Sequence, residues 1–159
     1  MYDIGEDKSK PPTHPQIERL SYELTNGDKR LRYFAVTHSP QPGDPNYQQY
    51  DILEKKFQES PPDLVLIEGN IDFDYKIQTR EEAIKRGEQY FTSYLAQKYN
   101  VSIESGDIAN NQTVPNETRD KYVIENAASK FKTHKNIDIV FGSGHAIREK
   151  AAWEQYFEL

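Results

Sequence analysis

The hydrophobic pattern near the start of the chain predicts a β-hairpin. Residues 17–24 form a mixed extended stretch, and Asn26-Gly27 follows as a dipeptide that tolerates positive φ in a tight turn. The next run, residues 31–37, is rich in aromatic and branched side chains that suit a strand. We therefore expect two strands joined by a turn at Asn26-Gly27.

Downstream of the hairpin, apolar runs of strand length alternate with segments of helical spacing. Continuous apolar runs are typical of strands buried on both faces, and apolar residues three and four apart are typical of a helix with one buried face. The clearest helix is 80–99, where Thr79 and Glu82 form a capping-box pattern and Gly87 lets the helix approach the sheet. The expected strands are residues 63–67, 101–103 and 137–141, and the expected helices are residues 47–60, 80–99, about 116–133 and about 146–157.

This order of elements predicts an α/β domain. Alternating strands and helices build a sheet that is parallel for most of its width, with helices on both faces. Here an N-terminal β-hairpin joins that sheet. Residues 1–16 hold three prolines among charged residues and are expected to be a flexible lead-in. Residues 17–159 are then a single domain, which fits a chain of 159 residues.

The composition argues against several classes of protein. The net charge is −6 and there is no basic stripe, so we expect no nucleic-acid partner. The absence of cysteine excludes a disulfide framework, a thiol nucleophile and thiolate-bound zinc. No apolar run approaches the roughly 20 residues that span a bilayer, and residues 1–10 lack the apolar segment of a signal peptide. We expect a cytoplasmic protein without a membrane span, and the sequence leaves its oligomeric state open.

Ionisable residues follow the predicted strands. Ligands of open α/β sheets bind beyond the carboxyl ends of the strands, so residues at those ends are the candidates for a site. If the strands are parallel neighbours, these side chains converge on one rim. Taken singly, each of these residues also fits a plainer explanation, as a solvated loop residue or a hydrogen-bonded turn residue. Glu88, which lies within the predicted helix 80–99, is expected to face water. The residues at the strand ends are His38, Glu68, Glu104 with Asp107, and His145.

The tripeptide Gly142-Ser143-Gly144 leads from the last strand into the last helix. Glycine permits close approaches that a side chain would block, and the N–H groups at a helix start stabilise an anion or a developing oxyanion. The same tripeptide also suits a plain strand-to-helix turn. We expect Gly142, Ser143 and Gly144, together with Asp107, to bind substrate.

Two histidines and one glutamate form a known ligand set for catalytic zinc, and they suit other divalent ions as well. His38, Glu68 and His145 are the candidate ligands, and Mn, Co or Zn is the expected ion. An ion with an open coordination position would activate water or polarise a carbonyl group. Ordinary metal motifs such as His-Glu-x-x-His are absent, so the spacing alone does not demand a metal.

Three segments carry a resemblance to a known family: Gly142-Ser-Gly-His145, the apolar run that ends at Glu68, and the segment around Arg119. In these segments the chain resembles the TraB/PrgY/Tiki superfamily, to which ChaN-like and erythromycin-esterase-like domains are related. Gly142-Ser-Gly-His145 matches the second of the two Gly-x-x-His motifs of that group, and the run that ends at Glu68 matches its glutamate-bearing strand. The segment around Arg119 matches the arginine at the start of a later helix. The first Gly-x-x-His motif reads Ala35-Val-Thr-His38 here, so alanine replaces its glycine. The resemblance runs from about Tyr22 to Phe157.

The resemblance implies a TraB-like domain and a metal-dependent hydrolase, peptidase- or esterase-like, that acts on a peptide or another small molecule. His38, Glu68 and His145 would hold the ion, and Glu68, Arg119 and His145 would be catalytic, with Arg119 stabilising anionic charge. Two alternatives stay open. One is a non-catalytic binding module for a peptide, haem or another small ligand, and the other is a metal-free esterase in which a histidine acts as general base.

Overall fold

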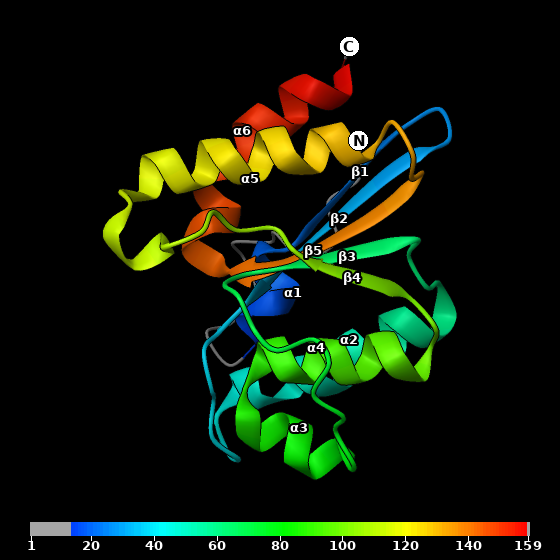
Figure 1. Cartoon of the computed structure of the whole chain (residues 1–159), viewed down its shortest axis with the longest axis vertical. Coiled ribbons are helices and arrows are strands. Elements are labelled where there is room, and N and C mark those ends of the chain that lie inside the picture. Colours follow the sequence, from blue (N-terminus) through cyan, green and yellow to red (C-terminus); the bar gives the residue numbers. More distant parts are fainter. Residues whose placement is uncertain (1–13, 159) are drawn as a thin grey trace.

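The computed structural model describes residues 14–158, which form one five-stranded sheet between two layers of helices (Figure 1). The strand order is β1-β2-β5-β3-β4, with β1 antiparallel to β2 and the other pairs parallel. This confirms the expected α/β fold with its N-terminal hairpin. The strands are β1 (Tyr22–Asn26), β2 (Lys29–Val36), β3 (Leu64–Ile67), β4 (Ser102–Ser105) and β5 (Asn136–Gly142).

The hairpin turns where the sequence predicted. Asn26 pairs with Lys29 across the turn, and Gly27 between them has a φ of 60°, a backbone conformation in which glycine is favoured. On the core face of the hairpin Tyr22 pairs with Tyr33, and their rings lie 5.2 Å apart.

Helices cover both faces of the sheet, as Figure 1 shows. One layer consists of α5 (Asn116–Lys130) and α6 (Ser143–Glu158), and the other of α1 (Gln16–Leu20), α2 (Gln49–Glu59), α3 (Arg80–Arg86) and α4 (Glu88–Lys98). Two short 3-10 turns, η1 (Pro45–Gln48) and η2 (Asn111–Thr113), lie in the connections. No helix within residues 14–158 is long and apolar enough to cross a membrane.

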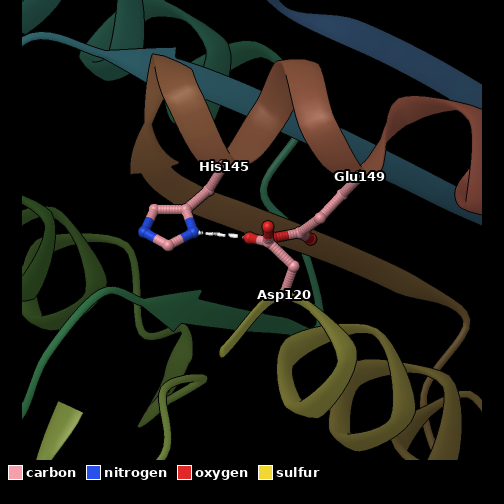
Figure 2. Close-up of side chains that lie close together, drawn as sticks. All are labelled: Asp120, His145 and Glu149. Atoms are coloured by element: carbon pink, nitrogen blue, oxygen red, sulfur yellow. Dashed lines mark hydrogen bonds and ion pairs between the residues drawn. The ribbon is translucent and has the colours of Figure 1, made fainter. Parts of the chain in front are cut away.

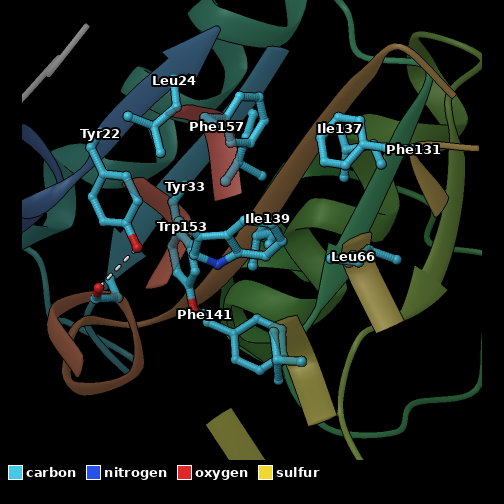
Figure 3. Packing of buried hydrophobic residues seen from close by; sticks show 14 of the residues in the cluster. Tyr22, Leu24, Tyr33, Leu66, Phe131, Ile137, Ile139, Phe141, Trp153 and Phe157 are labelled. Atoms are coloured by element: carbon cyan, nitrogen blue, oxygen red, sulfur yellow. Dashed lines mark hydrogen bonds between the residues drawn. The ribbon is translucent and has the colours of Figure 1, made fainter. Parts of the chain in front are cut away.

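Each helical layer packs against one face of the sheet and buries a separate apolar core there. The side with α5 and α6 is built around Trp153, whose ring lies among Tyr33, Ile139 and other buried side chains (Figure 3). The opposite side packs Tyr50, Leu53 and Phe57 of α2 against the sheet, as the helical spacing predicted. All four residues of β3 are buried, in keeping with a strand covered on both faces.

The structure corrects two expected elements. The predicted helix 80–99 is two helices, because Gly87 has a φ of 113° and separates α3 from α4. Thr79 caps α3 as predicted, since its hydroxyl accepts a hydrogen bond from the N–H of Glu82 at 3.1 Å. The stretch 17–24, expected to be extended throughout, begins as helix α1 and becomes strand β1 only at Tyr22.

The expected flexible lead-in lies mostly outside the described residues, which begin at residue 14. Its last residue, Gln16, belongs to α1 and contacts the residue that follows β2, because the hydroxyl of Thr37 donates to the side-chain oxygen of Gln16 at 2.9 Å.

Candidate functional site

Four parallel strands bring their carboxyl ends to one edge of the sheet. Val36 at the end of β2 pairs with Gly142, and Ile67 at the end of β3 pairs with both Val140 and Ser105. An open pocket of about 320 Å³ lies at this edge. The pocket is lined by Gln16, Val36, Thr37, His38, Glu68, Asn116, Gly142, Ser143, Gly144, His145 and Arg148. The structure thus brings His38, Glu68, His145 and the Gly-Ser-Gly tripeptide to one place.

Glu68 lies between the two histidines. Its Oε1 is 3.9 Å from Nε2 of His38, and its Oε2 is 3.5 Å from Nε2 of His145. The backbone N–H of Gly142 donates to Oε1 at 2.8 Å. A Cβ at position 142 would stand 3.3 Å from both Glu68 and His38, so glycine leaves room for this close arrangement. Gly142 therefore both donates a hydrogen bond to Glu68 and leaves space for its side chain.

Glu88 holds the other nitrogen of His38. One oxygen of Glu88 makes a short hydrogen bond with Nδ1 of His38, and the other accepts from the N–H of Ser39 at 3.1 Å. The expectation that Glu88 faces water is wrong, because the residue is only 3% exposed. The break at Gly87 starts a new helix at Glu88, which places this carboxylate next to His38. His38 itself remains open to solvent, with 60% of its side chain exposed.

Asp120 holds His145 in the same way. Its Oδ1 lies 2.6 Å from Nδ1 of the imidazole, and its Oδ2 accepts from Nε of Arg148 at 2.7 Å. Asp120 comes from α5 and His145 from α6, so the contact also joins the two helices of one layer. Each imidazole thus has a carboxylate at Nδ1 and Nε2 turned to Glu68. This arrangement is the usual way to fix the tautomer of a catalytic or metal-binding histidine.

Arg119 and Asp107 support Glu68 from the interior. Arg119 Nη2 donates to Glu68 Oε2 at 3.2 Å and to Asp107 Oδ2 at 2.7 Å. The Asp107 side chain is fully buried and also accepts from Asn111 and from the N–H of Gly69. Asp107, expected to bind substrate, is placed to orient Arg119. The other acid after β4, Glu104, is paired with Lys130 on the surface and does not join the site.

The local electrostatics keep Glu68 ionised. Burial alone would raise the pKa of Glu68, but hydrogen bonds from His145 and Gly142 and the charges of the two imidazoles lower it to about 2. The hydrogen bond to Glu88 raises the pKa of His38. Burial would lower the pKa of His145, but its bonds to Glu68 and Asp120 outweigh burial and raise it.

The site carries an excess of acid. Four carboxylates (Glu68, Glu88, Asp107 and Asp120) face two guanidinium groups (Arg119 and Arg148) and two imidazoles. With the acids ionised and both imidazoles neutral, this group has a net charge of −2. Two protons on the imidazoles, or one divalent cation, would balance that charge.

A compact group of possible metal ligands lies beside the pocket. Atoms of Asp120, His145 and Glu149 lie within 4.8 Å of one another, so these residues could hold a metal ion (Figure 2). Two features oppose an ion there. The Arg148 guanidinium lies 2.7 Å from Asp120 and 3.1 Å from Nδ1 of His145. Burial and the neighbouring Asp120 raise the pKa of Glu149 to about 9, so its carboxyl is neutral at pH 7.

Sequence reasoning missed the residues that support the site, namely Glu88, Asp120, Arg148 and Glu149. Only one signal for them was available. His145, Arg148 and Glu149 have i, i+3, i+4 spacing, which puts them on one face of a helix.

Comparisons of the chain with protein-family models, with curated proteins and with solved structures found no match.

Proposed function

We propose that this protein is a hydrolase of amide or ester bonds, of the TraB/Tiki type, that depends on a divalent metal ion. One observation carries the proposal. Two imidazoles, each backed by a carboxylate at Nδ1, turn Nε2 toward opposite oxygens of one ionised glutamate in an open pocket. This set of groups fits the two-histidine, one-carboxylate ligand pattern of hydrolytic metal sites.

The donor chemistry fits such an ion. When the imidazoles are neutral, Nδ1–H of His38 donates a hydrogen bond to Glu88 and Nδ1–H of His145 donates one to Asp120. In that tautomer Nε2 of each ring keeps a lone pair for an ion. Glu68 supplies an ionised carboxylate, and a divalent charge would balance the net −2 of the group. The proposed ligands are His38 Nε2, Glu68 and His145 Nε2, and the proposed ions are Mn, Co or Zn.

The protein's own groups prepare the site. Arg119 and the N–H of Gly142 hold Glu68 in place and keep it ionised. Ser143 and Gly144 line the pocket where a carbonyl group of the substrate would lie. Bound there, an ion would polarise the carbonyl and make water more acidic. Hydrolysis then adds water across the amide or ester, giving an acid and an amine or alcohol.

The test is turnover of a panel of short peptides and simple esters by the wild type, by the chelator-stripped protein and by Glu68→Gln. We expect activity that is lost on stripping, returns with Mn, Co or Zn, and is absent in Glu68→Gln. Glu104→Gln, which changes a surface acid outside the pocket, is the matched control. Binding of a peptide or haem with no turnover under any condition would replace this proposal with the binding module.

A metal-free esterase is the second candidate, and a specific observation favours it. Arg119 and the N–H of Gly142 already donate to the oxygens of Glu68. Within residues 14–158 the side chains close enough together to hold an ion are Asp120, His145 and Glu149, and Glu68 is not among them. On this mechanism the exposed Nε2 of His38 takes the proton from water, while Glu88 stabilises the imidazolium. Ester hydrolysis that survives thorough chelation and is lost in His38→Gln would establish it.

A further inference from the structure

One wall of the pocket carries a guanidinium group that is fixed in place. Arg148 Nε donates to Asp120 at 2.7 Å, and Nη2 lies 3.1 Å from His145 Nδ1. These contacts orient the plane of the group, yet 41% of the Arg148 side chain is exposed. Arg148 is therefore held from one side and open to the pocket on the other.

The outer nitrogen of Arg148 is available to a ligand. Nη1 has no hydrogen-bond partner or ion pair among residues 14–158. It lies against the first turn of α6, where a Cβ at Gly144 would stand 3.1 Å away. Glycine at position 144 lets the guanidinium lie against that turn.

Two neutral polar side chains line the same pocket. Neither the hydroxyl of Ser143 nor the amide of Asn116 makes a side-chain hydrogen bond within the part of the chain that the structure describes. Together with Arg148 they offer one charged donor and two neutral donors. An oxyanion accepts from such groups, and charge-assisted hydrogen bonds to guanidinium are the stronger kind.

We propose that Arg148, Ser143 and Asn116 bind an oxyanion of the ligand, either a carboxylate or a phosphate group. Because Asp120 orients the guanidinium in advance, less conformational entropy is lost when the anion binds. If the proposed function holds, on which this extension rests, the substrate is an acid whose anionic group sits beside the bond to be cleaved. A peptide with a free carboxyl terminus and a phosphorylated ester both have that chemistry.

The test is nuclear magnetic resonance titration of the ¹⁵N-labelled, chelator-stripped protein at constant ionic strength. Sodium acetate and sodium phosphate are the two anionic probes, and acetamide is the neutral one. We expect saturable shifts of Arg148 Nε and of the Ser143 and Gly144 amides with at least one anion and none with acetamide. Binding of acetate alone indicates a carboxylate ligand, and binding of phosphate alone indicates a phosphate ligand.

Variants assign the binding to these residues. Arg148→Gln should weaken anion binding on the order of tenfold or more, as expected for the loss of a charged donor. Ser143→Ala and Asn116→Ala leave the Arg148–Asp120 contact intact and should also weaken binding, which keeps the test valid if Arg148→Gln does not fold. Lys121→Gln, which removes an exposed cation of α5, should bind the anion as the wild type does.

Shifts that do not saturate, or equal affinity in Arg148→Gln and the wild type, would overturn the inference. The titration requires neither a metal nor turnover, so its result is independent of the hydrolase assay. Anion binding without hydrolysis of any substrate would leave this inference standing and the proposed function refuted.

Discussion

Glu68 divides its two carboxylate oxygens between two histidines, with Oε1 3.9 Å from His38 Nε2 and Oε2 3.5 Å from His145 Nε2. The three side chains come from the ends of β2 and β3 and from the first turn of α6. Because the sheet is parallel at these strands, residues separated by more than 100 positions meet at one edge.

Glu68 should make the stability of the protein depend on pH in the acid range. Its pKa falls from 4.5 to about 2 in the folded state, so its stabilising contribution is present above about pH 4.5 and is lost as the pH falls toward 2. The full contribution is about 3 kcal/mol. Urea unfolding between pH 2 and pH 6 should show a smaller acid-induced loss of unfolding free energy in Glu68→Gln than in the wild type. Equal slopes would contradict the assignment.

Glu149 should make the free energy of unfolding depend on pH in the opposite direction. Its folded pKa of about 9 lies above 4.5, so between these values the native state keeps a proton that the unfolded state has released. Raising the pH therefore destabilises the wild type in this window, by up to about 1.4 kcal/mol per pH unit. Glu149→Gln is a neutral isostere and should lack this decline when urea unfolding is measured at pH 5, 7 and 9. The control, Glu154→Gln on the same helix, should follow the wild type.

Removing the carboxylate behind His38 should weaken the proposed metal site without removing a ligand. In Glu88→Gln the amide no longer holds the imidazole as a carboxylate does, and loss of such a partner costs about 10–100-fold in metal affinity. Isothermal titration calorimetry with Zn or Mn measures the effect. Glu104→Gln, at an exposed acid paired with Lys130, is the control and should bind as the wild type does. Unchanged affinity in Glu88→Gln would separate His38 from the metal.

The buried ion pair between β2 and β5 should be essential to the fold. Asp138 accepts two hydrogen bonds from Arg32, at 2.8 and 2.7 Å, and both side chains are at most 3% exposed. Asp138→Asn leaves the arginine charge buried without its partner and should cost about 3–5 kcal/mol in urea unfolding. Asp28→Asn breaks a pair with Lys135 in which both side chains are 70% exposed, and it should cost less than about 1 kcal/mol.

The sheet and the residues at the strand ends could be predicted from the sequence, because both depend on local pattern. An apolar run followed at once by Glu68 places that carboxylate at the end of a buried strand, whatever the rest of the chain does. Because the strands are parallel, their carboxyl ends lie at one edge of the sheet, which brings His38 and His145 near Glu68. Edge strand β4 was shifted in the prediction because its alternating exposure carries a weak apolar signal.

The supporting carboxylates could not be predicted in the same way. Glu88 lies in a polar stretch and is buried only because Gly87 turns the chain and brings α4 against His38, 50 residues away in the sequence. In the sequence Asp120 does not differ from the other charged residues of α5, and it is buried because α6 packs over it and places His145 against it. Such contacts arise from the packing of helices against distant parts of the chain, on which the local hydrophobic pattern carries no information.

Thermal melting of the chelator-stripped protein with added Mn, Co or Zn shows whether Glu68 belongs to a metal site. A ligand that binds only the folded state stabilises it by about 2.7 kcal/mol at a hundredfold excess over its dissociation constant. We expect at least one ion to raise the melting midpoint of the wild type and of Glu149→Gln, but not that of Glu68→Ala. A midpoint that no ion raises would contradict the metal site. A rise that survives in Glu68→Ala and vanishes in Glu149→Gln would place the ion among Asp120, His145 and Glu149 instead.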